Sequence, residues 1–150
     1  MDIIQRQTDY ALRVVLYLGA NSQDSPTSVR RLAEVNEVPE EFLRKIAQAL
    51  SAAGIVRTER GRRGGLRLAR PASEISLLDV MEALDAGPSV NRCFADETIC
   101  GRRGNCVLRQ RLAAVQSDLL RVFAGVSLAE MMETHSLTPA GATAGQATTN

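Results

Sequence analysis

The chain contains 150 residues, of which 45% are hydrophobic and 23% are charged, and its formal net charge at pH 7 is +1. This length and composition are typical of a small globular protein and exclude a fibrous or largely disordered chain. The sequence has no apolar run of about eighteen residues and no signal-peptide pattern, so we expect a cytoplasmic protein with no membrane partner.

Two helices are predicted first. Apolar residues recur at helical spacing over residues 8–18 and predict a core helix that ends at Gly19. A second, short amphipathic helix is expected over residues 28–34, where Thr27 or Ser28 can cap the first turn.

A third helix is predicted to begin at Pro39 and to run to Gly54, because proline is tolerated at the first position and the acids that follow suit the positive helix end. A short helix, a turn of about four residues and a second helix with a basic outer face form the helix-turn-helix pattern, in which the second helix enters the major groove. There Arg and Lys reach guanine and Gln reaches adenine. The residues expected at the bases are Glu41, Arg44, Lys45 and Gln48, and those expected at the DNA backbone are Thr27, Ser28 and Arg30.

Two short strands are predicted over residues 55–60 and 66–70, joined by a glycine-rich basic tip. A hairpin directly after a helix-turn-helix is a wing. Six arginines fall between Arg57 and Arg70, against the single acid Glu59. Arginines on a glycine tip are suited to lie along phosphates or to enter the minor groove, whereas the alternative is a hairpin whose arginines simply face water. The wing residues expected on DNA are Arg60, Arg62 and Arg63.

The second half of the chain contains two further helical patterns. An amphipathic helix is predicted over residues 75–84, and a long helix follows Cys106, with a return to the body over residues 128–132. The long helix carries a heptad seam, which either packs on its own domain or pairs with a second copy. Because the winged domain is already complete and a palindromic site calls for two-fold symmetry, we expect a homodimer on a pseudo-palindromic operator. The seam consists of Leu108, Leu112, Val115, Leu119, Val122 and Val126.

All three cysteines lie in one polar loop, where Cys93, Cys100 and Cys106 are separated by six and then five residues. The loop has almost no apolar residues to pack, and thiols stay reduced in the cytoplasm, so these are available as ligands. Three thiols in such a loop indicate an iron–sulfur cluster or another metal. Neighbouring arginines, and the start of the long helix after Cys106, favour the thiolate that binds iron.

Two alternatives remain open for this loop. Structural zinc usually takes four ligands, in pairs about two to four residues apart, and the gaps here are wider. A disulfide plus a free thiol would make a redox sensor, although a reducing compartment opposes a permanent bond. An enzyme is not expected, because the sequence has no Ser-His-acid set and the tip over residues 61–65 lacks the ending of a phosphate-binding loop.

We therefore predict a mainly α fold: a winged helix-turn-helix domain with a small β-hairpin wing, plus a long dimerisation helix. The DNA-binding domain is expected over residues 1–88 and the cysteine loop over 89–106. The dimerisation helix and the C-terminal return are expected over 107–133. Residues 134–150 are mostly Ala, Gly, Thr and other uncharged residues, and we expect them to form a disordered tail.

These segments together resemble the IscR, NsrR and RirA family of bacterial winged-helix regulators. The resemblance covers nearly all of residues 1–133. It rests on Thr8-Asp-Tyr-Ala-Leu-Arg13, Val38-Pro-Glu-Glu-Phe-Leu-Arg-Lys-Ile46, Arg60-Gly-Arg-Arg-Gly-Gly-Leu-Arg-Leu68, Ile75-Ser-Leu-Leu-Asp-Val80 and the three-cysteine loop.

The resemblance implies a DNA-binding repressor with a 2Fe-2S or 4Fe-4S cluster that reports iron availability or nitric oxide. It implies Cys93, Cys100 and Cys106 as ligands. The histidine that IscR-type members place three residues after the last cysteine is Arg109 here, whereas Asp9 matches an acid that NsrR-like members use as a ligand. The alternative role of Asp9 is a helix-start acid interacting with the helix dipole. The alternative function is a zinc-stabilised or thiol-redox winged-helix DNA-binding regulator without an iron–sulfur cluster.

Overall fold

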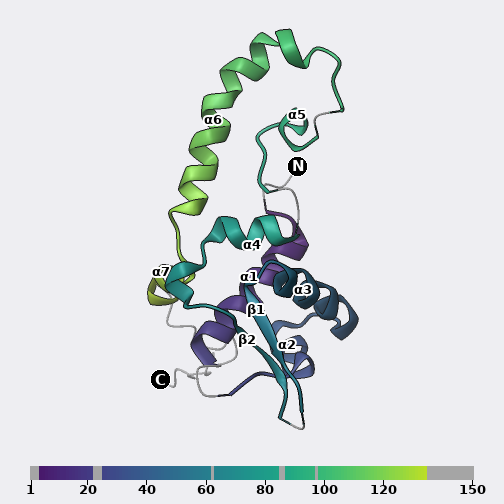
Figure 1. Ribbon diagram of the computed structural model, residues 1–150, viewed down its shortest axis with the longest axis vertical. Coiled ribbons are helices and arrows are strands. Elements are labelled where there is room, and N and C mark those ends of the chain that lie inside the picture. The colour runs from purple at the N-terminus through teal and green to yellow at the C-terminus, as the bar shows by residue number, and fades with distance from the viewer. Residues whose placement is uncertain (1–3, 22–24, 62, 85–86, 97, 135–150) are drawn as a thin grey trace, which may run out of the picture.

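The structure is a computed structural model that describes residues 4–21, 25–61, 63–84, 87–96 and 98–134. It is mainly helical with one two-stranded antiparallel sheet, as predicted. In Figure 1, helices α1 to α4 and the hairpin form a body, from which the long helix α6 rises. The elements are α1 (Arg6–Asn21), α2 (Val29–Asn36), α3 (Glu40–Ala52), β1 (Val56–Glu59), β2 (Gly65–Leu68), η1 (Ala72–Glu74), α4 (Leu77–Leu84), α5 (Arg92–Ala95), η2 (Arg103–Asn105), α6 (Val107–Ala124) and α7 (Leu128–Thr134).

The helix-turn-helix forms where it was predicted. Ser28 caps α2, because its hydroxyl accepts a hydrogen bond from the N–H of Arg31 at 3.2 Å. The helix continues to Asn36, two residues beyond the predicted end, and then Glu37 takes a left-handed conformation with φ of 54°. Its N–H closes the end of the helix on the carbonyls of α2. The turn therefore lies over residues 37–39, directly before α3.

The prediction that α1 ends at Gly19 is wrong, because the helix runs on to Asn21. Gly19 is buried, and a Cβ atom built on it would lie 2.6 Å from the Sδ atom of Met132 in α7. The glycine is therefore a packing residue that lets α7 approach α1 closely, and it does not stop the helix.

The hydrophobic core lies between α1, the helix-turn-helix, the wing and α4. Its centre is formed by side chains from every one of these elements, and Leu128 of α7 is also fully buried. The predicted return of the chain to the body after the long helix is therefore confirmed. The largest fully buried side chains are Leu18, Leu32, Leu43, Ile46, Leu50, Ile55, Leu66, Ile75, Leu128, Val14, Val15 and Val56.

The wing is tied to the start of α2. The strands pair from Val56 opposite Leu68 to Glu59 opposite Gly65, which is shorter than the predicted strands. Thr27 adds a bridge on the other side of β2, with its N–H donating to the Leu66 carbonyl at 2.9 Å and its carbonyl accepting at 2.8 Å. A Cβ atom on Gly65 would lie 2.4 Å from the Thr27 oxygen, so this close approach requires glycine.

Helix α4 and the end of α6 are joined through their termini. Ser76 and Asp79 cap α4 reciprocally, at 2.8 and 3.0 Å. Ser76 also forms a β-bridge with Ser127, the last of the three residues between α6 and α7. The foot of the long helix is therefore fixed to the body.

The rest of α6 is largely exposed and has no buried residue along its 18 positions. Leu108, Val115 and Val122 expose 60%, 50% and 62% of their surface. Leu112 and Leu119 are half-buried. The predicted seam is therefore divided. Leu108, Val115 and Val122 form an exposed row, which we call the open stripe, and Leu112 and Leu119 form a second row that is partly covered by the same chain. Among the residues that the structure describes, no helix is long and apolar enough to cross a membrane.

Candidate DNA interface and cysteine loop

The outer face of α3 carries the four residues predicted to contact bases. Leu43, Ile46, Ala47 and Leu50 bury the opposite face of the helix. This burial fixes the rotation of the helix about its own axis, so the polar side chains must point outward. The exposed residues of this outer face are Glu41, Arg44, Lys45 and Gln48.

Two of these side chains also border the wing. Arg44 and Gln48 line an open hollow between α3, the start of α2 and the strands, together with Thr58. Arg44 forms an exposed ion pair with Glu40, one helical turn earlier. Exposed pairs of this kind contribute little free energy, so the guanidinium is available to exchange its carboxylate for a nucleic acid partner.

The residues expected at the DNA backbone differ in what they can offer. Thr27 is half-buried and held by its bridge to β2. Ser28 uses its hydroxyl as the cap of α2. Arg30 is exposed and pairs with Glu34 at 3.1 Å. Arg30 is therefore the one among these three that carries a charge to the surface.

The wing tip exposes Arg60 and Arg63, while Arg62 lies outside the described residues. The tip turns through Gly61, which has φ of 117°, and the N–H of Gly64 donates to the Gly61 carbonyl at 2.9 Å. A Cβ atom on Gly64 would lie 2.4 Å from the Glu59 carbonyl oxygen. The glycines are therefore required for the tight turn that projects the two arginines.

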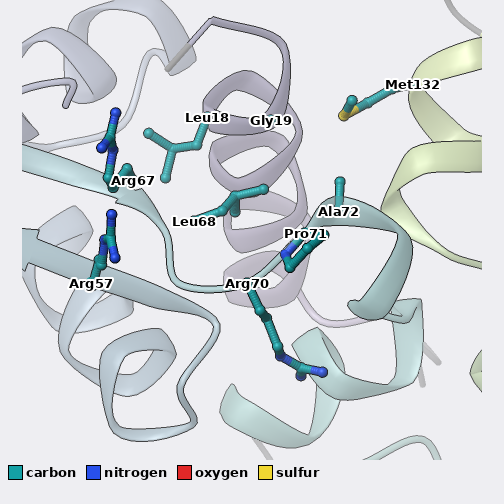
Figure 2. A pocket seen from close by; sticks show the side chains of 9 residues that line it. All are labelled: Leu18, Gly19, Arg57, Arg67, Leu68, Arg70, Pro71, Ala72 and Met132. Atoms are coloured by element: carbon teal, nitrogen blue, oxygen red, sulfur yellow. The ribbon is translucent and has the colours of Figure 1, made fainter. Parts of the chain in front are cut away.

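The other arginines of the basic segment stabilise the base of the wing. Figure 2 shows Arg57, Arg67 and Arg70 around a hollow that also borders Gly19 and Met132. Arg57 and Arg67 are directly opposite each other across the strands and both pair with one oxygen of Glu59, at 3.6 and 3.3 Å. Arg70 pairs with Asp79 of α4 at 3.3 Å. The basic segment therefore has two parts. The tip exposes Arg60 and Arg63, whereas the arginines at the base of the wing form ion pairs. The composition of the segment does not distinguish the two parts.

The three cysteines occupy different positions along their loop. Cys93 lies in α5 and is half-buried, Cys100 is exposed, and all three thiols are free of disulfide bonds. Cys106 is the N-cap of α6, and its Sγ atom accepts the N–H of Arg109 at 3.4 Å. The predicted place of Cys106 at the start of the long helix is confirmed. Hydrogen bonds from the side chain and the backbone of Thr98 lower the pKa of Asp96, which lies between the first two cysteines.

The four predicted ligands are not assembled around one point. In the described part of the chain, no three His, Cys, Asp or Glu residues lie close enough to share a metal ion. Asp9 is half-buried in α1 and pairs with Arg13 at 2.8 Å. The chemistry of the donors nevertheless fits an iron–sulfur cluster, because three accessible reduced thiols in one loop are the soft ligands that such a cluster takes.

Two residues of α6 that were not predicted as site residues hold this loop. Arg109 donates a hydrogen bond to the Cys93 carbonyl, and its guanidinium lies 4.5 Å from the centre of the Phe94 ring. The side-chain amide of Gln116 forms hydrogen bonds with Pro88 and Val90, where the loop begins. These contacts join positions far apart in the sequence, and no periodicity or spacing signals them.

Comparison with known proteins gives a consistent family. Residues 4–134 match the sequence model of the Rrf2 family, described as an iron-dependent transcriptional regulator. The chain is similar to protein aau3 of Rhizobium meliloti, with 36% identity over 87% of this chain and 84% of that protein. It is 35% identical to the HTH-type transcriptional regulator NsrR of Geobacillus kaustophilus, over 84% of this chain and 86% of that protein.

The fold is also found among solved structures. T. potens IscR superposes with a TM-score of 0.70 over 87% of this chain and 86% of that chain, at 21% sequence identity. At this identity the likeness concerns the fold alone. It confirms the winged-helix architecture.

Proposed function

Because the chain belongs to the Rrf2 family, whose members are transcriptional regulators and not enzymes, we propose that it is a DNA-binding repressor that senses iron availability or nitric oxide through an iron–sulfur cluster. One observation carries the proposal. Three free thiols lie in the loop that leads into the N-terminus of α6, and the C-terminal end of α6 is fixed to the winged helix-turn-helix. DNA binding follows from the family, whereas the cluster, the signal and the repressor role are our proposal. A cytoplasmic location agrees with a regulator that binds DNA.

We assign the cluster to Cys93, Cys100 and Cys106, with Asp9 as the candidate fourth ligand. When bound, a 2Fe-2S or 4Fe-4S cluster supplies an inorganic centre that is sensitive to iron supply and nitric oxide. The protein contributes an exposed middle thiol, a Cys106 thiol at the N-terminus of α6, and a loop that Arg109 links to that helix.

The division of labour on DNA follows from the exposed side chains. We assign base contacts to Glu41, Arg44, Lys45 and Gln48, because α3 presents them on one outer face. We assign DNA-backbone contacts to the start of α2 and to the wing tip, because exposed arginine side chains at these places can reach phosphate groups. The backbone contacts comprise Thr27, Ser28, Arg30, Arg60, Arg62 and Arg63.

We further propose that the protein acts as a homodimer on a pseudo-palindromic operator. The support is the open stripe of Leu108, Val115 and Val122, which is too exposed and too regular for a helix that packs only on its own chain. A second copy of the same helix presents an equal stripe and would cover it. On this basis we propose a DNA-binding domain over 1–88, a ligand loop over 89–106 and a dimerisation segment over 107–133.

Two sets of contacts support coupling between the cysteine loop and the DNA face. The foot of α6 is held at Ser76, and α7 packs on α1 through Met132 and Gly19. At the other end of α1, Tyr10 contacts Phe42 at the start of the recognition helix. A change in the loop that shifts α6 or the start of α1 would therefore alter the spacing of the two recognition helices.

The decisive experiment is purification without oxygen, followed by the visible spectrum and the iron and sulfide content. A variant with Cys93→Ala, Cys100→Ala and Cys106→Ala is the control. We expect a coloured wild-type protein with acid-labile sulfide, a colourless variant, and operator binding that changes when the cluster is removed. Zinc or no metal in both proteins would instead favour a zinc-stabilised or thiol-redox regulator, and equal operator affinity with and without the cluster would contradict the sensor role.

A further inference from the structure

We propose that Arg109 and Gln116 are positioning residues that clamp the segment from Pro88 to Cys93 along α6. The clamp itself depends only on contacts within this chain. Its consequence for ligand binding rests on the proposed function, because it concerns where the first and third cysteines lie before a cluster binds.

The lower half of the clamp is the side-chain amide of Gln116. Its Nε2 atom donates to the Pro88 carbonyl at 2.9 Å, and its Oε1 atom accepts the N–H of Val90 at 2.9 Å. One amide thus bonds a carbonyl and an N–H two residues apart, as the edge of a neighbouring strand would. Both bonds are part-buried, so water competes with them less than on an open surface.

The upper half of the clamp is Arg109. Its Nη1 atom donates to the Cys93 carbonyl, and its guanidinium stacks over Phe94, the next residue. Its own backbone N–H donates to the Sγ atom of Cys106. One residue therefore contacts both the first and the third cysteine of the loop, and it does so without supplying a ligand atom.

The clamp and the open stripe use different faces of α6. Arg109 and Gln116 are seven residues apart, which is close to two turns, so they lie on one face. Leu108, Val115 and Val122 repeat with the same period on a neighbouring face, and all three are exposed. The helix can therefore hold its own loop while the stripe remains available to another copy of the chain.

The clamp sets the position of Cys93 relative to Cys106 before any ligand arrives. Restricting the backbone at Cys93 and at Cys106 in advance removes part of the freedom that the loop would otherwise lose on binding. We therefore expect loss of the clamp to weaken retention of the cluster, while the helix-turn-helix and the wing, which make none of these contacts, stay folded.

The first arm of the test uses metal-free protein, so it does not depend on a cluster. Amide hydrogen exchange at Val90 is compared in wild-type, Gln116→Ala and the control Gln110→Ala, whose side chain is exposed on the same helix. Loss of one part-buried hydrogen bond predicts roughly fivefold faster exchange at Val90 in Gln116→Ala. The control should match wild-type, and unchanged exchange in Gln116→Ala would overturn the clamp.

The second arm measures the rate of cluster loss to a chelator. Arg109→Ala should lose the cluster several-fold faster than wild-type. Arg109→Lys should recover part of the difference, because lysine retains a hydrogen-bond donor. Arg111→Ala, at an exposed position, is the control and should lose the cluster at the wild-type rate. The thermal midpoints of the metal-free proteins should be equal, which separates positioning from general stability.

Equal loss rates for Arg109→Ala and Arg111→Ala would overturn the role of Arg109. A wild-type protein that takes up no cluster would refute the proposed function, and Val90 exchange would then decide the clamp alone.

Discussion

The ring of Tyr10 in α1 meets the ring of Phe42 in α3 edge to face, with centroids 5.9 Å apart and planes at 81°. Arg6 lies 5.6 Å from the Tyr10 ring centre and donates to its hydroxyl at 3.0 Å. Tyr10 follows Asp9, the candidate fourth ligand, and Phe42 lies in the first turn of α3. The pair therefore places the start of α1 in direct contact with α3, the helix that we propose reads the DNA bases.

This contact predicts a measurable coupling. In a double-mutant cycle of Tyr10→Leu and Phe42→Leu, we expect an interaction free energy of about 0.5–1.5 kcal/mol from urea unfolding, the range for aromatic pairs. A cycle of Tyr17→Leu and Phe42→Leu, with Tyr17 farther along α1, should give a value near zero. Additive effects of Tyr10→Leu and Phe42→Leu would show that the ring contact carries no coupling.

Gly19→Ala should give less than the gain of about 1 kcal/mol that alanine has over glycine in a helix. The added Cβ would lie 2.6 Å from the Met132 sulfur, which is the end of a flexible side chain and must move away. In a protein that already carries Met132→Ala, the same substitution should give the full gain of about 1 kcal/mol. The free energy of unfolding in urea is the measurement, and equal effects of Gly19→Ala in the two proteins would contradict the packing role.

Arg44→Ala and Arg63→Ala should affect DNA binding in different ways. Loss of a base contact by Arg44 should cost about 1–3 kcal/mol on the operator and much less on random duplex, whereas loss of a phosphate contact by Arg63 should weaken both and reduce the salt slope by about 1. Arg57→Ala is the control, since Arg57 pairs with Glu59 at the base of the wing. Fluorescence anisotropy at several salt concentrations measures these effects, and equal losses on both duplexes for both variants would refute the assignment.

Val115→Glu should convert the proposed dimer into a folded monomer. Val115 is 50% exposed within one chain, so the charge adds little strain there, but in a helix pair it would be buried without a partner. Ser117→Glu, at an exposed position two residues along, should remain dimeric. Sedimentation measures the mass and circular dichroism checks the helix content. A wild-type monomer, or a dimeric Val115→Glu protein, would contradict pairing through this stripe.

Glu130 links the docking of α7 to pH. Hydrogen bonds from the backbone and the side chain of Ser127 lower the pKa of its carboxyl. A lowered folded-state pKa contributes stability above the ordinary glutamate pKa, and that stability is lost as the pH falls through the lower folded value. Glu130→Gln should therefore be less stable than wild-type at pH 7, with a difference that shrinks in acid. The difference is measured as the urea midpoint of unfolding of the two proteins at pH 7 and at acidic pH. Glu133→Gln, on the same helix, is the control.

The helix-turn-helix and the wing were predictable because their signals are local. The Ser28 cap, Pro39 before α3 and the glycines at the wing tip each act within a few residues of their position. The role of Gly19 was mistaken because glycine can either end a helix or permit close packing. The contact with Met132, which shows that packing is its role here, joins residues more than 100 positions apart and leaves no local signal. The division of the arginines was missed because it depends on which side chains meet across the hairpin and with α4, and not on composition. The contacts of Arg109 and Gln116 were missed because they join segments 16 to 28 residues apart. Asp9 as a ligand stays a prediction.

The contact of Arg109 with Cys93 and Cys106 also bears on the length of the cysteine loop. Both ends of the loop are held, so an insertion between them lengthens a closed segment without moving its ends. The entropy cost of closing such a segment grows only slowly, by about 0.6 kcal/mol for each doubling of its length. The spacing between the cysteines is therefore free to change through evolution at little cost to folding, and the gap of six residues before Cys100 is one of many that the same helix can hold.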